Sequence, residues 1–370
     1  MTRTVVGLDI GASGVRAAEI APGRRPSLRK YASIALAEGV VRAGHVVDSD
    51  ALTDALRKLW LQGGFGTRDV VVGIANNGVL VRQMDLDWMP PADFRKALRY
   101  QVADALPIPV DEANLDYYLL DEIEPDAEDE DQRRIARVML VAASREMVDT
   151  FVRSIQAAGL SPVRVDMLPF ALVRAVSPVV DLASPLEVIV DIGADTVVVV
   201  VHQGGRPRFV RTLVGHGGEA ITQALVSRYD WTWEEAERTK ITVGLPEDPA
   251  QAEPGSVDET GPGHPAPHRP AHPAQGVIAE HVDSLVAELS ATLDYYRASS
   301  SREVPLSHLL LTGLAADLGG LADALEADLE LPVAYLSVVE RLRMPRRMVL
   351  LPEEEQALTV PAGLCLGAAS

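Results

Sequence analysis

The sequence predicts an α/β protein made of two related halves, with a smaller α/β subdomain inserted in the first half. The tetrapeptide Asp-Ile-Gly-Ala occurs at 9–12 and again at 191–194, each time between apolar runs. Strand-like and helix-like patterns alternate along both halves, which is typical of an α/β fold. Between them, residues 85–159 carry a proline-flanked helix, a hairpin pattern and a second helix, the size of a small domain.

Bulk properties exclude several classes of protein. A chain of 370 residues is long enough for more than one domain. The net charge of −19 argues against nonspecific nucleic-acid binding, and against docking on anionic lipid by charge alone. Cys365 is the single cysteine, which excludes an intrachain disulfide and fits a reducing compartment. No signal-peptide pattern and no apolar run of ~20 residues is present, so we expect a cytoplasmic protein.

Elements of the first half follow from periodicity. A hairpin opens the chain at 5–15, and Leu52, Leu56 and Leu59 have the spacing of an amphipathic helix. The further elements expected are a strand at 27–37, a helix at 49–61, and strands at 69–75 and 78–84.

The inserted segment is marked by a change in residue composition at Pro90 and Pro91. Pro91 suits the first turn of a helix, and Gly159 suits the C-cap of a second one. We expect a helix at 92–106, paired strands at 114–121 and 134–143, a solvated acidic loop at 121–131, and a helix at 146–158.

The second half starts from the repeated hairpin, 188–201. A helix that follows Leu168-Pro169-Phe170 and ends at about 176 precedes it, and a glycine cluster after a strand at 207–214 starts the next helix. The remaining expected elements are helices at 219–228, 232–240, 276–296 and 318–329, strands at 309–313 and 331–336, and a tail helix after Pro361.

Residues 245–275 have the composition of a linker, with eight prolines and no aromatic residue. His264, His268 and His272 are spaced as metal ligands would be on a helix, but the prolines between them forbid that helix. We therefore predict disorder here. The predicted division is a first lobe of 1–84, completed by 160–185 and 337–370, an insert of 85–159, and a second lobe of 186–336.

The two Asp-Ile-Gly-Ala turns carry the chemistry of a phosphate clamp. Glycine after the aspartate lets backbone N–H groups approach an anion, and the hydroxyls of Ser13 and Thr196 add donors. Asp9 and Asp191 repel phosphate themselves, so they are useful if a hydrated Mg²⁺ lies between carboxylate and phosphate oxygens. The alternative is a pair of ordinary Asp-Gly hairpin turns. The shared tetrapeptide favours the clamp.

These residues resemble the actin-like ATPase superfold, a duplicated two-lobe fold of the ribonuclease H-like type. Its five landmarks occur in order. They are a first phosphate hairpin at 9–15, a connecting helix at 170–176, a second phosphate hairpin at 191–197, an Ala-Glu-x-x-Lys helix at 236–240, and a strand–turn–helix adenosine motif at 309–327.

Within that superfold the chain is most similar to the type IV pilus assembly protein PilM family, relatives of the cell-division protein FtsA. The stretches that carry this resemblance are GLDIGASGVRAAEI at the start, RKALRYQVADALPIPVDEANLDYYLL in the insert, EVIVDIGADTVVVVV at the second hairpin, and LSATLDYY. The insert is the discriminating part, because phosphate hairpins are shared by sugar kinases, chaperones and actins.

The resemblance implies that ATP and Mg²⁺ are cofactors. Asp9 and Asp191 would hold the metal and, with Asp166, form the catalytic carboxylates. Glu237 and Lys240 would reach the ribose or adenine, although an exposed helix ion pair is the plain alternative. The implied nucleotide-binding residues are Gly11, Ala12, Ser13, Gly14, Arg16, Gly193, Ala194, Asp195, Thr196, Gly217, Gly218, Glu237, Lys240, Gly313 and Leu314.

Three departures from the family pattern bear on catalysis. Arg16 replaces a common lysine, and Leu314 replaces the second glycine of the adenosine turn. Leu168 occupies the place of the Glu or Gln that orients the attacking water, which leaves Asp166 as the nearby carboxylate. We therefore expect a nucleotide binder with weak or absent ATPase activity.

The resemblance also implies partners. The expected partner is the N-terminal cytoplasmic peptide of a PilN-like inner-membrane protein, held near the insert. Through it the chain would reach the pilus assembly platform and motor ATPases, and the membrane by partner alone. The oligomeric state stays open, homo-oligomers included. Two alternatives are a small-molecule kinase, for which no base stands out, and an FtsA-like filament former, whose basic membrane helix the tail at 360–370 lacks.

Overall fold

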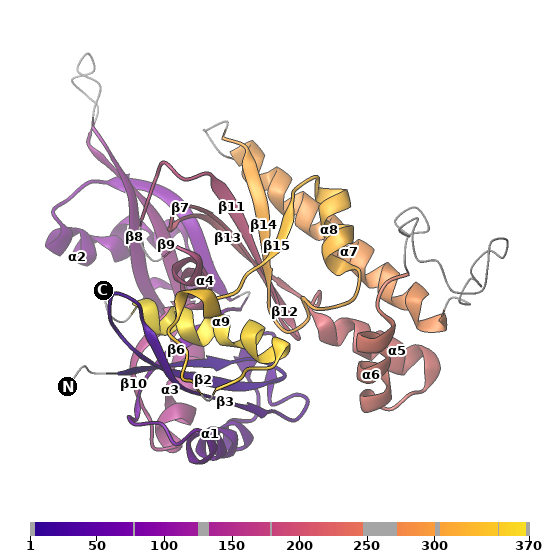
Figure 1. Ribbon diagram of the computed structural model, residues 1–370. Coiled ribbons are helices and arrows are strands. Elements are labelled where there is room, and N and C mark those ends of the chain that lie inside the picture. Colours follow the sequence, from indigo (N-terminus) through magenta and orange to yellow (C-terminus); the bar gives the residue numbers. More distant parts are fainter. Residues whose placement is uncertain are drawn as a thin grey trace.

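The computed structural model describes residues 4–76, 78–124, 133–177, 180–246, 272–299, 304–346 and 348–367. Figure 1 shows two sheets with helices between and around them, and a separate small sheet beside them. The strand orders are β10-β6-β1-β2-β3 and β13-β12-β11-β14-β15. In each sheet three consecutive antiparallel strands are followed by two strands parallel to the first. The duplication predicted from the tetrapeptide therefore extends to whole sheets.

The first sheet is buried on both faces. Its strands are β1 (Val5–Ile10), β2 (Gly14–Ala21), β3 (Ser27–Ala35), β6 (Asp69–Ile74) and β10 (Ser161–Met167). Helices α1 (Ser49–Gly63) and α3 (Arg145–Ala157) pack on one face through apolar side chains such as Leu56 and Ile155. Helices α4 (Leu168–Val176) and α9 (Pro352–Gly367) pack on the other face, between the two sheets (Figure 1).

The second sheet is formed by the strands after the repeated tetrapeptide. They are β11 (Leu186–Ile192), β12 (Thr196–Gln203), β13 (Arg206–Val214), β14 (Leu306–Thr312) and β15 (Val333–Tyr335). Helices α7 (Pro273–Ser299) and α8 (Leu321–Leu329) cover its outer face, while α5 (Gly218–Tyr229) and α6 (Trp233–Val243) lie together at one end (Figure 1). Residues 247–271 of the predicted linker, with His264 and His268, lie outside the described residues.

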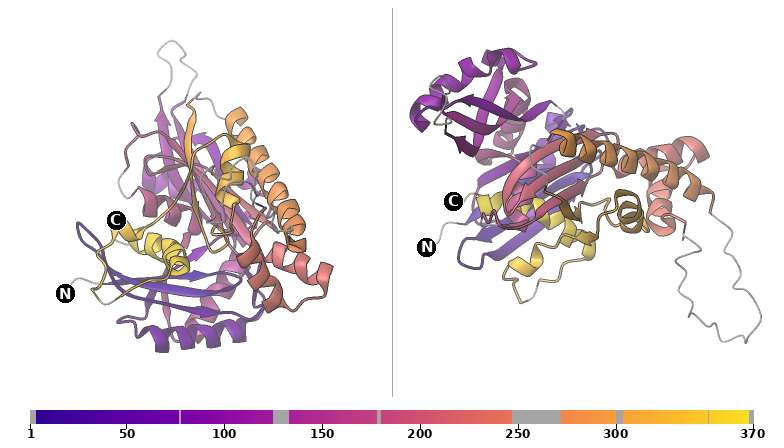
Figure 2. Two further views of the ribbon diagram at one scale, coloured as in Figure 1. Left: turned by 45° about the vertical axis from the view of Figure 1, so that its right-hand side comes forward. Right: turned by 90° about the horizontal axis from the view of Figure 1, so that it is seen from above.

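The inserted subdomain is a three-stranded antiparallel sheet with the order β7-β9-β8. Its strands are β7 (Val79–Asp87), β8 (Ala113–Ile123) and β9 (Ile135–Ser144), and α2 (Pro91–Gln101) packs on them. Seen from above, it lies to one side of the second sheet (Figure 2).

Three boundaries predicted from the sequence need correction at the insert. The strand expected to close the first lobe at 84 is β7, which pairs along its length with β9 and joins neither large sheet. The insert therefore begins near residue 78, because a boundary at 84/85 would divide a strand. The strand expected at 114–121 continues to Ile123 as β8, with Asp121 opposite Arg137, so the acidic loop expected from 121 starts later. The helix expected to reach 106 ends at Gln101 and continues only as a short 3-10 turn, Ala103–Ala105.

The tail helix also differs from the prediction, since α9 starts at Pro352 and runs through Pro361. Proline inside a helix removes a hydrogen bond and clashes with the preceding turn, at a cost of about 3 kcal/mol. Burial offsets this cost, because residues from Leu358 to Cys365 are enclosed between the sheets. The fit is close: a Cβ on Gly7 would lie 2.0 Å from the Pro361 carbonyl oxygen, so β1 needs glycine there.

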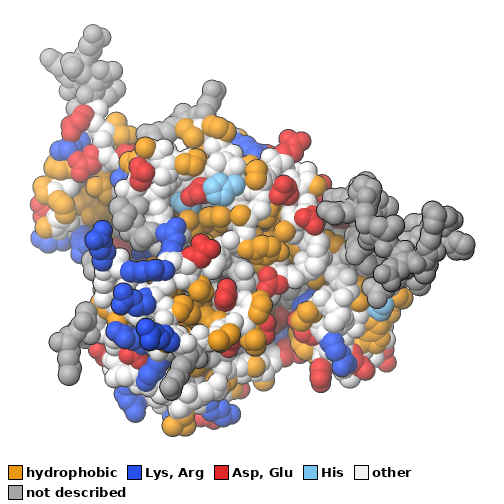
Figure 3. All heavy atoms as spheres, viewed as in Figure 1, with side chains coloured by type: hydrophobic (Ala, Val, Ile, Leu, Met, Phe, Trp, Pro, Cys, Tyr) orange, Lys and Arg blue, Asp and Glu red, His pale blue; other side chains and the backbone are white. Residues whose placement is uncertain are grey.

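The surface charge is unevenly distributed. Figure 3 shows Lys and Arg side chains gathered in a band over the side of the first sheet, while acidic side chains are spread over the rest of this face. Among the described residues, no helix combines the length and the apolarity that spanning a membrane requires.

Candidate nucleotide site

The two phosphate hairpins have the same backbone geometry. Asp9 and Asp191 are the last residues but one of β1 and β11. In the first turn the Gly11 N–H donates to the Gly14 carbonyl oxygen at 3.0 Å. In the second turn the Gly193 N–H donates to the Thr196 carbonyl oxygen at 2.9 Å. The repeated sequence therefore folds into a repeated loop.

The two hairpins face one cavity of about 80 Å³ between the lobes. The predicted residues that line it are Asp9, Gly11, Ala12, Ser13, Arg16, Asp191, Gly193, Ala194, Asp195, Thr196, Gly313 and Leu314. They come from segments far apart in the sequence, and the fold brings them together. Pockets that enclose a drug-sized ligand measure about 300–1,000 Å³, so this arrangement is a closed one that must widen to admit a nucleotide.

The cationic side chain of Arg16 lines this cavity together with the Asp9 carboxylate. Its Nη1 lies 3.3 Å from Asp9 Oδ2, and its Nη2 donates to Ser13 Oγ at 2.9 Å. Burial raises the pKa of Asp9, and the adjacent Arg16 opposes that rise. Burial also raises the pKa of Asp191, to about 7, with a further rise from the charge of Asp9. Arg16 was expected to contact phosphate; in this arrangement it pairs with the carboxylate side.

The charge balance of the cavity fits a divalent cation. Asp9 and Asp191 line it together with the Arg16 guanidinium, and burial is the main cause that raises the pKa of both carboxyl groups. A cation bound beside them would favour their charged forms. Mg²⁺ is held by one or two carboxylates, several waters and the phosphates of its nucleotide. Asp9 and Asp191 could supply those carboxylates. Among the described residues, no set of three or more His, Cys, Asp or Glu side chains is arranged around a metal position.

The N-terminus of α5 lies against the second hairpin. The N–H groups of Gly218 and Glu219 donate to the carbonyl oxygens of Gly193 and Ala194, at 3.0 and 2.7 Å. A Cβ on Gly217 would lie 2.3 Å from the Ala194 oxygen, so only glycine allows this approach. Gly217 and Gly218 line a neighbouring cavity of about 260 Å³. The positive end of the helix dipole thus lies beside the predicted phosphate position.

Lys240 is buried and fully bonded within the second lobe. Its Nζ donates to the Gly218 carbonyl oxygen at 3.0 Å, to Thr222 Oγ1 at 2.9 Å and to Glu237 Oε2 at 2.8 Å. An ammonium group has three protons, so contact with a ribose would require giving up one of these bonds. Neither Glu237 nor Lys240 lines the cavity between the hairpins. In this arrangement the pair holds α5 against α6.

Gly313 fits the predicted adenosine turn. Its φ is +97°, and a Cβ there would lie 2.4 Å from the Ile192 carbonyl oxygen and 2.5 Å from Asp191 Oδ1. Any side chain would therefore collide with the end of β11. Leu314 follows it directly and lines the cavity.

Asp166 and Gly14 are not among the residues that line the cavity. Asp166 Oδ2 accepts from Arg174 Nη2 at 2.5 Å, and its Oδ1 accepts from the Met167 N–H at 2.8 Å. This carboxylate is therefore committed to β10 and α4. Leu168, at the place where the resemblance expects a water-orienting residue, lines the cavity with an apolar side chain.

Sequence reasoning missed Gln356 and Gly44, which also line the cavity. Gln356 comes from α9 and accepts a hydrogen bond from Thr312 Oγ1 at 3.1 Å. It was missed because the helix was expected to begin after Pro361. Gly44 lies between β4 (Val41–Arg42) and β5 (His45–Val46), and the adjacent Ala43 N–H donates to the Asp195 carboxylate across the lobes.

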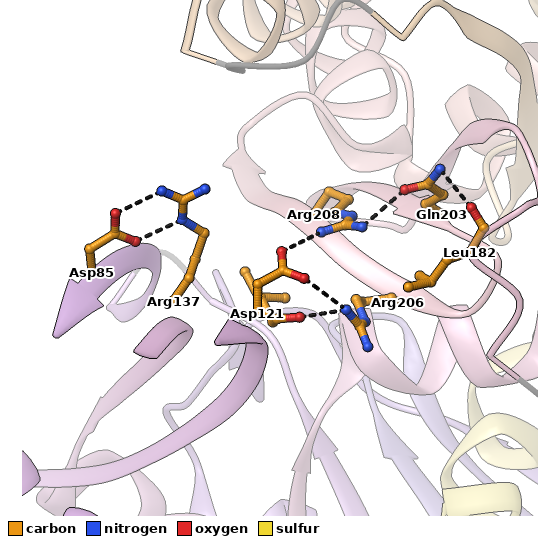
Figure 4. Close-up of polar contacts among 8 residues, drawn as sticks. Asp85, Asp121, Arg137, Leu182, Gln203, Arg206 and Arg208 are labelled. Carbon is orange, nitrogen blue, oxygen red and sulfur yellow. Dashed lines mark hydrogen bonds and ion pairs between the residues drawn. The ribbon is translucent and has the colours of Figure 1, made fainter. Parts of the chain in front are cut away.

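Besides the Ala43–Asp195 contact between the lobes, a cluster of ion pairs links the insert to the second lobe. Figure 4 shows the Asp121 carboxylate between Arg206 and Arg208 of β13, at 3.4 and 3.5 Å. Arg208 continues to Gln203 Oε1 at 2.9 Å. On the insert side, Arg137 binds Asp85 through two hydrogen bonds of 2.7 Å. The insert is thereby connected to the sheet that carries the second hairpin.

These features define the chain as an actin-like protein with a paired-hairpin site between two lobes. The family model of the type IV pilus assembly protein PilM matches residues 7–252, and the chain belongs to this family. The predicted fold is confirmed.

Solved structures agree with this fold. A chain of the PilM-PilN type IV pilus biogenesis complex is 24% identical, with 100% of both chains covered and a TM-score of 0.81. The ethanolamine utilization protein EutJ from Carboxydothermus hydrogenoformans is 15% identical, with 98% of this chain and 89% of that chain covered and a TM-score of 0.52. MreB5 of Spiroplasma citri, bound to ADP, is 11% identical, with 92% and 95% covered and a TM-score of 0.52.

Proposed function

We propose that this protein is an ATP-binding scaffold of a type IV pilus assembly complex, located on the cytoplasmic face of the inner membrane. Mg-ATP would bind between the phosphate hairpins and fix how the two lobes meet. The observation that carries this proposal is the single cavity lined by both Asp-Ile-Gly-Ala turns and by the Gly313 turn. Membership of the PilM family supports the pilus assignment.

The chemistry of the cavity favours binding over turnover. Hydrolysis of ATP requires a group that orients the attacking water. Leu168 cannot do so, and the Asp166 carboxylate is bound to Arg174 outside the cavity. The same lack of a free base disfavours the small-molecule kinase alternative. We expect turnover near the uncatalysed rate, and a steady-state phosphate-release assay with Leu168→Gln as the comparison variant measures it.

The partner would be the N-terminal cytoplasmic peptide of a PilN-like membrane protein. This part of the proposal rests on the full-length similarity to a chain of a PilM-PilN complex. Asp121 joins the insert to β13, so a change in how the lobes meet on nucleotide binding would be transmitted to the insert. Through this partner the scaffold would reach the assembly platform and its motor ATPases.

Titration of a fluorescent PilN-type peptide, with and without Mg-ATP, tests the coupling. We expect nucleotide to change the peptide Kd by about 5- to 150-fold, the usual range of allosteric coupling. Asp121→Ala should reduce that factor without abolishing ATP binding, and Asp149→Ala, exposed on α3 away from the cavity, serves as the control. Equal peptide affinity with and without nucleotide would contradict the coupling.

A further inference from the structure

Five exposed arginines lie together at the edge of the first sheet. Arg24 and Arg25 belong to the β2–β3 turn, and Arg341, Arg343 and Arg346 belong to the segment between β15 and α9. Backbone bonds join the two segments: the Arg343 N–H donates to the Pro26 oxygen at 2.8 Å, and the Leu28 N–H donates to the Arg343 oxygen at 3.1 Å. We call these five side chains the arginine face.

No ion pair involving the arginine face occurs within the described part of the chain. Arg25 Nη2 donates to the Glu340 carbonyl oxygen at 3.1 Å, which is a neutral acceptor. In a chain with a net charge of −19, these five exposed cations form a local concentration of positive charge. They lie on the side of the molecule where Figure 3 shows the basic band.

Apolar side chains are exposed beside these arginines. Val349 is 88% exposed and Leu351 is 55% exposed, three and five residues after Arg346. The Met348 N–H donates to the Pro345 oxygen at 3.1 Å, which closes a turn just before Val349. Cations and exposed aliphatic side chains in one short segment suit a surface that offers both negative charge and an apolar layer.

We propose that the arginine face docks on the anionic phospholipid headgroups of a membrane. Guanidinium forks match phosphate oxygens bidentately, and each basic side chain near an anionic bilayer adds to the attraction. Val349 and Leu351 would enter the interfacial region. The acidic remainder of the molecule is repelled by the same bilayer, which sets the orientation. Membrane attachment would then be direct as well as through a partner, and this inference does not depend on nucleotide binding.

A nucleic acid or an acidic protein could also bind the arginine face. A lipid surface accounts both for the five cations and for the exposed side chains of Val349 and Leu351. Phosphate alone explains the five cations and gives no role to Val349 and Leu351. A nucleic acid would also be repelled by the overall charge, without an apolar layer to compensate. The test below separates these sources of negative charge.

Vesicle flotation of the full chain tests the proposal. We expect it to float with vesicles of equal parts phosphatidylglycerol and phosphatidylcholine, to stay behind with phosphatidylcholine alone, and to be released as salt rises. The variant Arg24→Glu with Arg346→Glu should weaken partitioning at least about 25-fold, at about five-fold for each arginine removed. Val349→Ser should weaken it by a smaller factor, since one aliphatic side chain is lost.

The matched control is Arg95→Glu with Arg238→Glu, two exposed arginines on α2 and α6 that give the same change in net charge. Its partitioning should stay within about two-fold of the native chain, because only cations next to the bilayer contribute. Equal loss in both double variants, or no preference for anionic vesicles, would overturn the proposal. Binding to a single-stranded oligonucleotide but to no vesicle would overturn it in favour of nucleic acid.

Discussion

The two phosphate hairpins share a tetrapeptide and a turn, yet they differ in the two positions that matter for charge. Strand register places Arg16 opposite Asp9 in the first hairpin, and Val198 opposite Asp191 in the second. Ser13 and Asp195 also occupy equivalent places. Ser13 Oγ accepts from Arg16 within its own hairpin, whereas the Asp195 carboxylate accepts from Ala43 in the other lobe.

This difference shows that two copies of one loop can have different roles in the same site. The first hairpin carries its own counter-ion and is cross-linked internally. The second has no cation in register. Burial and the charge of Asp9 raise the pKa of Asp191 to about 7, and the turn residue Asp195 accepts a hydrogen bond from the other lobe. We interpret the first hairpin as a charge-balanced anchor, and the second as the side whose charge is balanced when Mg²⁺ and nucleotide bind.

Removal of Arg16 should have the largest effect on stability. Arg16→Leu leaves two buried carboxylates without a counter-ion, and we expect the free energy of unfolding to fall by about 3 kcal/mol in metal-free buffer above pH 7. Urea denaturation measures it. Arg297→Leu, which breaks an exposed pair with Asp294, should cost no more than about 0.5 kcal/mol. Similar losses of unfolding free energy in the two variants would contradict the prediction that Arg16 stabilises the fold as a counter-ion.

Removal of the Asp191 charge should stabilise the metal-free protein. The folded pKa of Asp191 is above the ordinary value of 3.8, so the folded state holds its proton where the unfolded state releases it. This group therefore contributes less stability as pH rises from 3.8 towards about 7. Asp191→Asn removes that loss and should be more stable than the native chain by about 2 kcal/mol above pH 7. Thermal melts across this range check it, and a difference independent of pH would contradict it.

Loss of the cross-lobe contact should loosen the cleft. Asp195→Ala removes the acceptor of the Ala43 N–H, and a bond to a charged group is worth about 1.5–3 kcal/mol. We expect faster hydrogen exchange at Ala43 and faster nucleotide release, measured by mass spectrometry and stopped flow. The same substitution in the first hairpin, Ser13→Ala, should leave the exchange at Ala43 unchanged, since Ser13 makes no contact with that turn.

Ser13→Ala should have the smallest effect. It removes one hydrogen bond to Arg16, which still contacts Asp9 and the Gly14 oxygen. We expect a loss of about 1 kcal/mol in unfolding free energy, measured in urea. A loss as large as that of Arg16→Leu would mean that the hydroxyl, and not the ion pair, holds the first hairpin together.

Local patterns predicted much of the fold and of the site. The hairpins, the connecting helix and the Gly159 cap depend on residues close in sequence, and these lie where expected. Partner choice is not local. Alternation identified a strand near 78–84 but could not say that it pairs with β9, because the side-chain period is the same in any sheet.

Tertiary contacts and the spatial distribution of charge explain the remaining differences between the predictions and the structure. Pro361 normally ends a helix, and only the tight packing of α9 between the sheets allows it inside one. Lys240 was expected to face a nucleotide, whereas the fold gives it three internal acceptors. The net charge could not predict the arginine face, because the summed charge of the chain does not say where the charged side chains lie.

The most direct measurement of the central claim is calorimetric titration of the purified chain with Mg-ATP and Mg-ADP, repeated with Asp191→Ala and with the control Asp149→Ala. The paired-hairpin account predicts binding by the native chain and the control, with loss of about 100-fold or more in affinity when the metal-holding carboxylate is removed. Unchanged affinity in Asp191→Ala, or no nucleotide binding by the native chain, would contradict it.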